Sequence, residues 1–377
     1  MEDNKTEVLR RFHSLERRFR KDPAYAARYS AMLNDYIHHG HARLTTLKEL
    51  ENSPPWTFYL AHHGVTYPHK PDKVRVVFDL SSPPEKSLNS KLLKGPDFLT
   101  GLLGVFLRFR ANPVALISDI EKMFHQVRVR PEEQAALRFF WRNPGDHSPP
   151  LVYQMTVHVF GGISSPSVCA FALRKTAEDN RDQFPDVADI IVRNFYVDNF
   201  LGSTNTEEEA ISVAQQLTQM LRLGGFRLTK WVSSSRAVMA SIPEQERAEP
   251  TLDLSKDQLP IERTLGVLYS SEDDCFFFRP ALDSGARRVR KTNSQASKVA
   301  FSAGSHRSIL SAVSTIYDPL GFLSPVVITA KCLLQDICRL RLDWDTKLPD
   351  ILLNRWNDWC AGLDVLKDLR IPRCLRR

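Results

Sequence analysis

The sequence predicts a mixed α/β protein, and three stretches support this prediction. "KVRVVFDL" at residues 73–80 alternates as a β-strand does, and "PVALISDI" at 113–120 is a short apolar run that suits a buried strand. "TNTEEEAISVAQQLTQMLRLGGF" at 204–226 spaces its apolar residues as an amphipathic helix does. Thr206 can cap this helix, because Glu209 follows three residues later. The 377 residues suffice for about two or three domains.

The remaining segments complete this organisation. Residues 1–50 space apolar side chains three and four apart, which predicts helices, and Pro54–Pro55 break that pattern. Residues 51–270 have mixed α/β character. Residues 271–308 are polar and predict a linker, whereas 309–377 return to helical periodicity and predict a further segment. Its predicted helices run through "SILSAVSTIYDPLGF" at 308–322 and "VVITAKCLLQDICRLRL" at 326–342.

Composition limits the functional classes without selecting one. The 51 basic and 44 acidic residues give a net charge of +7, which is compatible with a polyanionic partner but does not identify it. No apolar run is long enough to span a membrane, and the charged start has no signal-peptide core. The six cysteines form no C-x-x-C pair, so we expect a reduced, intracellular chain without a zinc site.

Two aspartates occupy positions where a carboxylate needs an explanation. Asp119 ends the apolar run "VALIS", and Asp198 lies 79 residues later in "NFYVDNFLG". Aromatic and β-branched residues on both sides of Asp198–Asn199 predict two short strands joined by a tight turn at this pair. A fold that joined the two carboxylates would form a Mg²⁺ site suited to phosphoryl transfer. Two ordinary strand-end or turn aspartates are the alternative, and these residues alone leave both open.

Four ordered motifs carry a family resemblance. "KVRVVFDLS", "ALISDIEKMFHQVRV", "MTVHVFGGISSPSVCAFAL" and "NFYVDNFL" resemble the motifs of reverse transcriptases, most closely those of the BEL/Pao group of long-terminal-repeat retrotransposons. "IERTLGV" and "IYDPLGFLSP" extend the similarity, which covers roughly residues 50–377. It implies an α/β (α+β) right-hand polymerase fold in which 51–270 form fingers and palm. Residues 1–50 would be a helical polyprotein linker, and 309–377 a helical or mixed thumb or connection segment.

The resemblance also assigns the metal site. Asp119 matches the first metal-binding aspartate, with the carbonyl of Ile120 as an extra ligand, and Asp198 matches the first acid of a Y-x-D-D turn. Asn199 stands where relatives carry the second acid, so the expected site is competent but attenuated. The implied cofactor is Mg²⁺, with Mn²⁺ as an alternative.

Further matches concern the nucleotide and the primer. Arg75 matches the arginine that grips the triphosphate, and Phe124 matches the aromatic residue that excludes a ribose 2′-hydroxyl. Gly161, with Gly162 beside it, matches the loop behind the nucleotide. The remaining matches are Lys230, placed like a lysine that protonates pyrophosphate, and Leu265–Gly266, which resemble the primer-grip turn.

Two departures from the family pattern affect nucleotide binding. Phe160 stands where many relatives outside the group carry glutamine, so a polar contact is missing. Tyr67 stands roughly where relatives carry a finger lysine, so triphosphate binding is expected to be weaker unless Lys70 or Lys73 substitutes.

Other motifs have weaker support. "ALDSGA", with Asp283, has the form of an aspartic protease motif, but the polar, basic stretch after it does not suit a protease. "HHGHAR" at 38–43 and His62–His63 lack acid or cysteine partners at metal-ligand spacing, which favours surface or packing roles.

The sequence therefore predicts an RNA-directed DNA polymerase. Its partners would be an RNA or DNA template with a primer, deoxynucleoside triphosphates and other polyprotein domains. We expect it in cytoplasmic retroelement particles, with the nucleus as an alternative. Because the sequence ends at "IPRCLRR", where an RNase H domain would begin, we expect a truncated polyprotein piece. A weakened or inactive remnant that binds nucleic acid is the main alternative, and an aspartic peptidase is a third.

Overall fold

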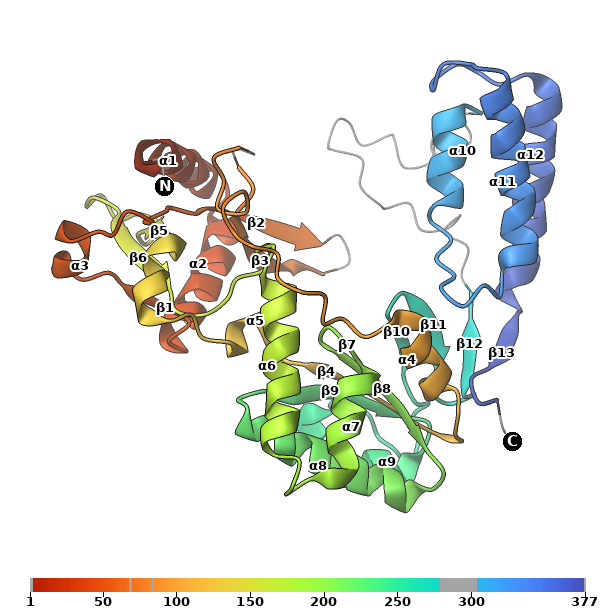
Figure 1. The fold of residues 1–377 in the computed structure, drawn as a ribbon. Helices are drawn as coiled ribbons and strands as arrows, with labels where there is room; N and C mark the ends of the chain where they lie inside the picture. Colours follow the sequence, from red (N-terminus) through yellow and green to blue (C-terminus); the bar gives the residue numbers. More distant parts are fainter. Residues whose placement is uncertain (1–2, 68–69, 83–84, 279–303, 376–377) are drawn as a thin grey trace. The chain divides into compact units, whose positions relative to one another are not determined.

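The structure is a computed structural model that describes residues 3–67, 70–82, 85–278 and 304–375. The chain divides into two compact units, and its elements are labelled in Figure 1. Unit 1 comprises Met1–Leu99, Ile120–Ile191 and Thr218–Arg227, and unit 2 comprises Thr100–Asp119, Val192–Leu217 and Leu228–Arg377. Within the described ranges, no helix is both long and apolar enough to span a membrane. The "ALDSGA" motif lies outside the described residues.

Unit 1 combines helices with a three-stranded sheet, in the order β1-β6-β5, and a two-stranded hairpin, β2-β3. Its helices are α1 (Lys5–Lys21), α2 (Pro23–His38), α3 (Leu47–Glu51), α5 (Met123–Gln126), the 3₁₀ helix η1 (Pro131–Leu137) and α6 (Ser165–Asp179). Its strands are β1 (Ala42–Leu44), β2 (Ala61–Tyr67), β3 (Lys70–Asp79), β5 (Arg138–Trp141) and β6 (Leu151–Met155).

The N-terminal helices are part of the core of unit 1. α1 buries Val8, Phe12, Leu15 and Phe19, which the helical period brings to one face. α2 begins at a proline, whose fixed φ suits a first helical position, and Asp22 accepts a hydrogen bond from Tyr25 N. The apolar period therefore predicted these helices correctly, and β1 follows within the same N-terminal stretch.

Unit 2 contains two four-stranded sheets and a C-terminal group of helices. Its strands are β4 (Val114–Ile120, whose last residue belongs to unit 1), β7 (Phe195–Tyr196), β8 (Asn199–Thr204), β9 (Leu228–Ser233), β10 (Ile261–Thr264), β11 (Val267–Ser270), β12 (Cys275–Phe277) and β13 (Arg370–Pro372). Its helices are α4 (Leu102–Phe109), α9 (Arg236–Ser241), η2 (Glu244–Glu246), α10 (His306–Val313), α11 (Ser324–Arg339), α12 (Asp350–Gly362) and η3 (Leu363–Lys367). Helices α7 (Pro185–Asn194) and α8 (Glu207–Leu223) contain residues of both units.

The first sheet of unit 2 has the strand order β7-β8-β4-β9, with β4 between β8 and β9 (Figure 1). β4 runs antiparallel to β8, from the pair Val114↔Thr204 to the pair Asp119↔Asn199. Ala115 and Leu116 are fully buried, as the short apolar run predicted. This register determines which side chains meet at the far end of β4.

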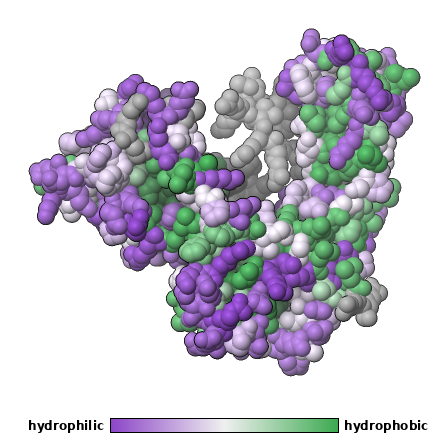
Figure 2. Space-filling model, in the orientation of Figure 1, coloured by the Kyte–Doolittle hydropathy of each residue, from purple (hydrophilic) through white to green (hydrophobic). Residues whose placement is uncertain are grey.

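The second sheet, β10-β11-β12-β13, draws its last strand from the end of the chain. β12 lies inside the stretch predicted as a linker, and it pairs with β11 and β13. Helices α10, α11 and α12 share an apolar core that includes Ile309, Leu333 and Trp356. Exposed apolar side chains also remain on this segment, where Figure 2 shows green patches among purple ones. The predicted helix through "IYDPLGF" ends earlier, at Val313.

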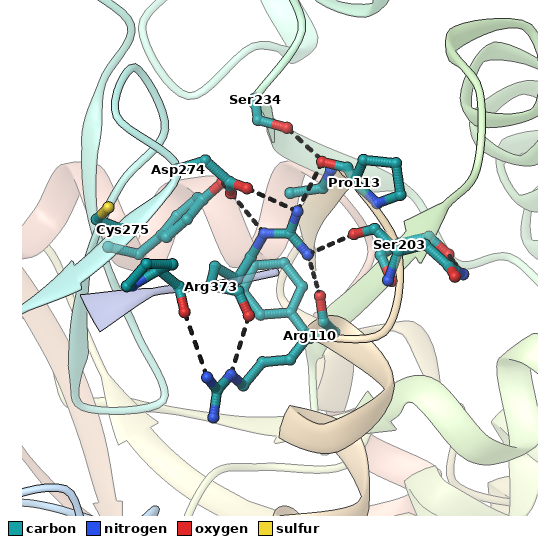
Figure 3. Close-up of polar contacts among 12 residues, drawn as sticks. Arg110, Pro113, Ser203, Ser234, Asp274, Cys275 and Arg373 are labelled. Carbon is teal, nitrogen blue, oxygen red and sulfur yellow. Dashed lines mark hydrogen bonds and ion pairs between the residues drawn. The ribbon is translucent and has the colours of Figure 1, made fainter. Parts of the chain in front are cut away.

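Arg373 fixes the end of the second sheet against the turn that precedes β4 (Figure 3). Its fully buried guanidinium donates two hydrogen bonds to the carboxylate of Asp274, at 2.5 and 2.9 Å. It also donates to three backbone carbonyls, those of Phe109, Asn112 and Pro113. All five guanidinium N–H donors thereby have an acceptor, so Arg373 links the C-terminal strand to the start of β4.

Candidate active site

The pairing of β4 with β8 brings Asp119 and Asp198 to the same end of the first sheet of unit 2. Asp119 is the Cα partner of Asn199, and Asp198 is the preceding residue in the β7–β8 turn. Asp119 is thus a neighbour of Asp198 and Asn199, two predicted site residues that lie far from it in sequence. Ile120, the predicted carbonyl ligand, is the last residue of β4 and the first of its segment of unit 1.

The turn that carries Asp198 is centred one residue earlier than the sequence predicted. Tyr196 pairs with Asn199, so the central residues are Val197 and Asp198, and Asn199 already belongs to β8. Val197 has a φ of 57°, whereas Asp198 has no positive φ, which is the pattern of a type II′ turn. A left-handed valine costs about 1–3 kcal/mol, and such strain often marks functional sites. Sequence reasoning missed Val197 because valine ordinarily indicates a strand.

Asp198 is a partly buried carboxylate next to a second carboxylate. Burial is the main cause that raises its pKa above the usual value, and the charge of Asp119 raises it further. A hydrogen bond opposes these effects, because Asn199 Nδ2 donates to Asp198 Oδ1 at 2.7 Å. An aspartate at position 199 could not donate this bond. The asparagine therefore stabilises the ionised form of Asp198.

Lys230 supplies the positive charge nearest to Asp119. Its Nζ lies 2.7 Å from Asp119 Oδ2, while the side chain remains 65% exposed. Lys230 lies in β9 but has a φ of 55°, so the backbone leaves the extended conformation at this residue. The site in unit 2 thus combines two carboxylates, one amide and one ammonium group. In the described ranges, no three histidine, cysteine or acidic side chains converge as metal ligands.

The predicted primer-grip residues also lie in unit 2, in the two-residue turn between β10 and β11. Thr264 pairs with Val267, and the residues between them have positive φ, 46° at Leu265 and 88° at Gly266. Two positive values are the pattern of a type I′ hairpin turn. A Cβ at position 266 would lie 2.5 Å from Cδ1 of Tyr317, so this position has no room for a side chain.

Unit 1 contains the predicted sugar and nucleotide-loop residues. Phe124 packs edge-to-face against Phe160, with ring centroids 5.4 Å apart. Phe160, the departure from the family pattern, therefore provides an aromatic contact for Phe124. Gly161 has a φ of 100°, which favours glycine, and its carbonyl accepts a hydrogen bond from Asn89 Nδ2 at 2.9 Å.

Arg75 lies exposed on β3 and belongs to unit 1 as well. Burial raises the pKa of Tyr36 to about 12, and the charge of Arg75 opposes this rise. Burial also lowers the pKa of His125 to about 4, and Arg75 is among the cations that lower it further. The ring of His41, from "HHGHAR", lies 5.3 Å from that of His125. Arg75 is therefore near an aromatic and histidine cluster that the sequence did not predict.

Comparisons with known proteins find a family match for the C-terminal part of the chain. Residues 305–377 match a family model described as a Pao retrotransposon-like RNaseH-like domain. This is the segment predicted to be a thumb or connection, and here it forms α10, α11, α12, η3 and β13. No curated protein sequence matches the chain.

Among solved structures, the chain is similar to the foamy viral protease-reverse transcriptase dRH in complex with double-stranded DNA. The TM-score is 0.52 and the sequence identity 14%, and the alignment covers 89% of this chain. At this identity the likeness establishes that the chain shares its fold with part of that protein. The chain spans 47% of the length of that protein.

Proposed function

We propose that this chain is the reverse-transcriptase region of a Pao/BEL-type retrotransposon polyprotein and acts as an RNA-directed DNA polymerase. The primer 3′-hydroxyl would attack the α-phosphate of a deoxynucleoside triphosphate, and pyrophosphate would leave. The observation that carries the proposal is the meeting of Asp119 and Asp198 at one end of the sheet. The fold shared with the foamy viral protein supports the proposal, and so does the DNA duplex bound to that protein.

The donor set at this end of the sheet suits Mg²⁺. Asp119 and Asp198 provide carboxylate oxygens, and the Asn199 amide and the Ile120 carbonyl are the further candidates. Mg²⁺ needs few protein ligands, because it keeps waters and binds substrate phosphates. A bound divalent ion would stabilise the charge on the attacking and leaving oxygens. The raised pKa of Asp198 fits such a site, because two close carboxylates favour a cation beside them.

The remaining residues would bind and orient the substrates. Arg75 would hold the triphosphate, since a guanidinium donates two parallel hydrogen bonds to phosphate oxygens. Phe124 would lie against the sugar, and Gly161 would form the loop behind the nucleotide. Lys230 would donate a proton to the leaving pyrophosphate, from an ammonium group that is exposed yet held near Asp119. Palm and fingers would be the parts of the fold that carry these groups.

Primer extension with the purified chain tests the proposal. A labelled DNA primer on RNA and on DNA templates should be extended in the presence of Mg²⁺ and all four deoxynucleotides. Chelation of the metal should stop the reaction. A chain that binds the primer–template but extends neither template at any Mg²⁺ or Mn²⁺ concentration would instead be a nucleic-acid-binding remnant, the alternative that Asn199 raises.

Binding of the primer–template is expected to weaken steeply with salt. Contacts of basic side chains with phosphates release counterions, and about four such contacts would lower affinity on the order of 100-fold between ~50 and ~200 mM salt. The net positive charge of +7 is small for a chain of this length, so we expect local basic patches, one of them near Arg75. Fluorescence anisotropy at several salt concentrations measures the slope. An affinity that does not change with salt would favour the alternative that the chain is an inert remnant, which folds but has no function in nucleic-acid binding.

Replacing Phe124 by valine is expected to admit ribonucleotides while deoxynucleotide use stays largely intact. The ring would exclude one hydroxyl by size, and valine is too short to fill that space. The measurement is the ratio of kcat/KM for the two nucleotide types. Phe171→Val, at an exposed phenylalanine of the same unit, is the matched control. An unchanged ratio in Phe124→Val would assign Phe124 to packing against Phe160.

Replacing Asn199 by aspartate is expected to lower the Mg²⁺ requirement of primer extension. A third negative charge near the metal raises metal affinity, whereas without metal it repels Asp198 and removes the 2.7 Å hydrogen bond. Without divalent ions, Asn199→Asp should therefore have a lower melting temperature than the wild type, and adding Mg²⁺ should restore the melting temperature. Titrations with Mg²⁺, followed by primer extension and by melting temperature, measure the Mg²⁺ requirement of both forms. Identical titrations for the two forms would mean that position 199 serves only the local structure of the β7–β8 hairpin.

A further inference from the structure

Tyr317 lies directly against the β10–β11 turn. A Cβ at Gly266 would come within 2.5 Å of ring atom Cδ1 and 2.6 Å of Cε1, so the ring occupies the space that any other residue would need. Nevertheless, 49% of Tyr317 is exposed to solvent. One side of this aromatic residue therefore contacts the turn and another side is available to a partner.

The segments on both sides of Tyr317 are fixed. Ile316 packs against the cluster that contains Phe278 and Leu323. The Asp318 carboxylate accepts hydrogen bonds from the backbone N–H groups of Phe322 and Leu323, at 3.0 and 2.6 Å. Because these contacts hold the backbone, little ordering entropy would be lost when a partner binds the ring.

We propose that Tyr317 is a binding residue for the primer strand, with its ring against a base or sugar next to the Leu265–Gly266 turn. This inference rests on the proposed polymerase function and adds a residue to it. Nucleic-acid strands without sequence preference are bound by exposed aromatic rings, on which bases stack. The glycine lets the Tyr317 ring lie directly against the turn, so the ring and the turn form one surface on which a strand could lie.

The first test is the affinity of the full chain for a labelled primer–template at fixed salt. Tyr317→Ala should weaken binding about 5- to 100-fold, as expected for the loss of one stacking contact, whereas Tyr317→Phe keeps the ring and should bind within about twofold of the wild type. Unfolding midpoints confirm that each variant folds. Wild-type affinity in Tyr317→Ala would overturn the inference.

A glycine substitution gives an independent test of the same contact. Gly266→Ala should displace the Tyr317 ring and weaken binding as Tyr317→Ala does, and the double variant should bind no more weakly than either single one. Gly145→Ala is the matched control, because Gly145 has a similar φ of 91° but nothing within 4 Å of an added Cβ. Additive losses in the double variant would contradict a shared role.

Binding and extension are measured separately, so the two proposals can fail separately. If Tyr317→Ala binds weakly but the wild type extends no primer, the Tyr317 inference holds and the polymerase function fails. If the wild type extends primers and Tyr317→Ala binds as tightly, the inference fails alone. A wild-type chain that does not bind the primer–template would overturn the inference.

Discussion

Replacement of Asp119 by asparagine is expected to reduce primer extension by at least about 100- to 1,000-fold. The substitution keeps the shape of the side chain but removes one of the two carboxylate charges that meet at the end of β4. It also removes the ion pair with Lys230, whose Nζ lies 2.7 Å from Asp119 Oδ2. The loss should appear in kcat, because these charges act on the reacting phosphate rather than on the duplex.

Two measurements separate this loss from a folding defect. Affinity of Asp119→Asn for the primer–template should stay within a few-fold of the wild type. Glu121→Gln is the matched control, since Glu121 is two residues away and pairs with Arg227 at the surface of unit 1. This control should extend primers normally. Extension by Asp119→Asn at a rate close to that of the wild type would exclude the proposed metal site.

Local elements of the fold could be predicted because their signals are contained in a few consecutive residues. Glu209 N donates to Thr206 Oγ1 at 3.2 Å, as the spacing of these two residues predicted for the start of α8. The apolar run at 113–120 forms β4 for the same reason, since a strand of that composition must be buried on both faces.

The errors arose where tertiary context overrides local preference. Asn199 favours a turn by itself, yet it pairs with Tyr196 in the sheet, and Val197 takes the left-handed position instead. No propensity predicts a valine there, because its conformation is maintained by the surrounding pairing of β7, β8 and β4. The helix predicted through Tyr317 ends at Val313, before Pro319.

The candidate site could not be derived from spacing. Asp119 and Asp198 lie 79 positions apart and meet only because β4 pairs with β8, and the motif resemblance, not the periodicity, indicated this. The hydrogen bond from Asn199 to Asp198 likewise depends on the final register. Arg373 is the extreme case, because its backbone acceptors lie about 260 residues earlier and no local pattern marks it.

Replacement of Arg373 by alanine is expected to destabilise unit 2 by about 3–5 kcal/mol, the usual cost of removing one partner from a buried ion pair. Asp274, with only 28% of its side chain exposed, would lose two charge-assisted hydrogen bonds. The carbonyls of Phe109, Asn112 and Pro113 would lose their side-chain donor as well (Figure 3). Since Pro113 directly precedes β4, the strand that carries Asp119 would lose its attachment to Arg373.

Chemical denaturation monitored by circular dichroism measures the change in the free energy of unfolding. Arg373→Lys should fall between wild type and alanine, because an ammonium has three donors and cannot match the fork of the Asp274 carboxylate. Arg370→Ala is the matched control, three residues earlier at the start of β13. Its side chain is exposed, donates to the nearby carbonyls of Lys367 and Leu369, and lies over the Phe277 ring at 5.2 Å from the centroid. That control should change stability by less than about 1 kcal/mol. Equal midpoints for Arg373→Ala and Arg370→Ala would mean that β13 is held by its pairing with β12 and not by the buried guanidinium.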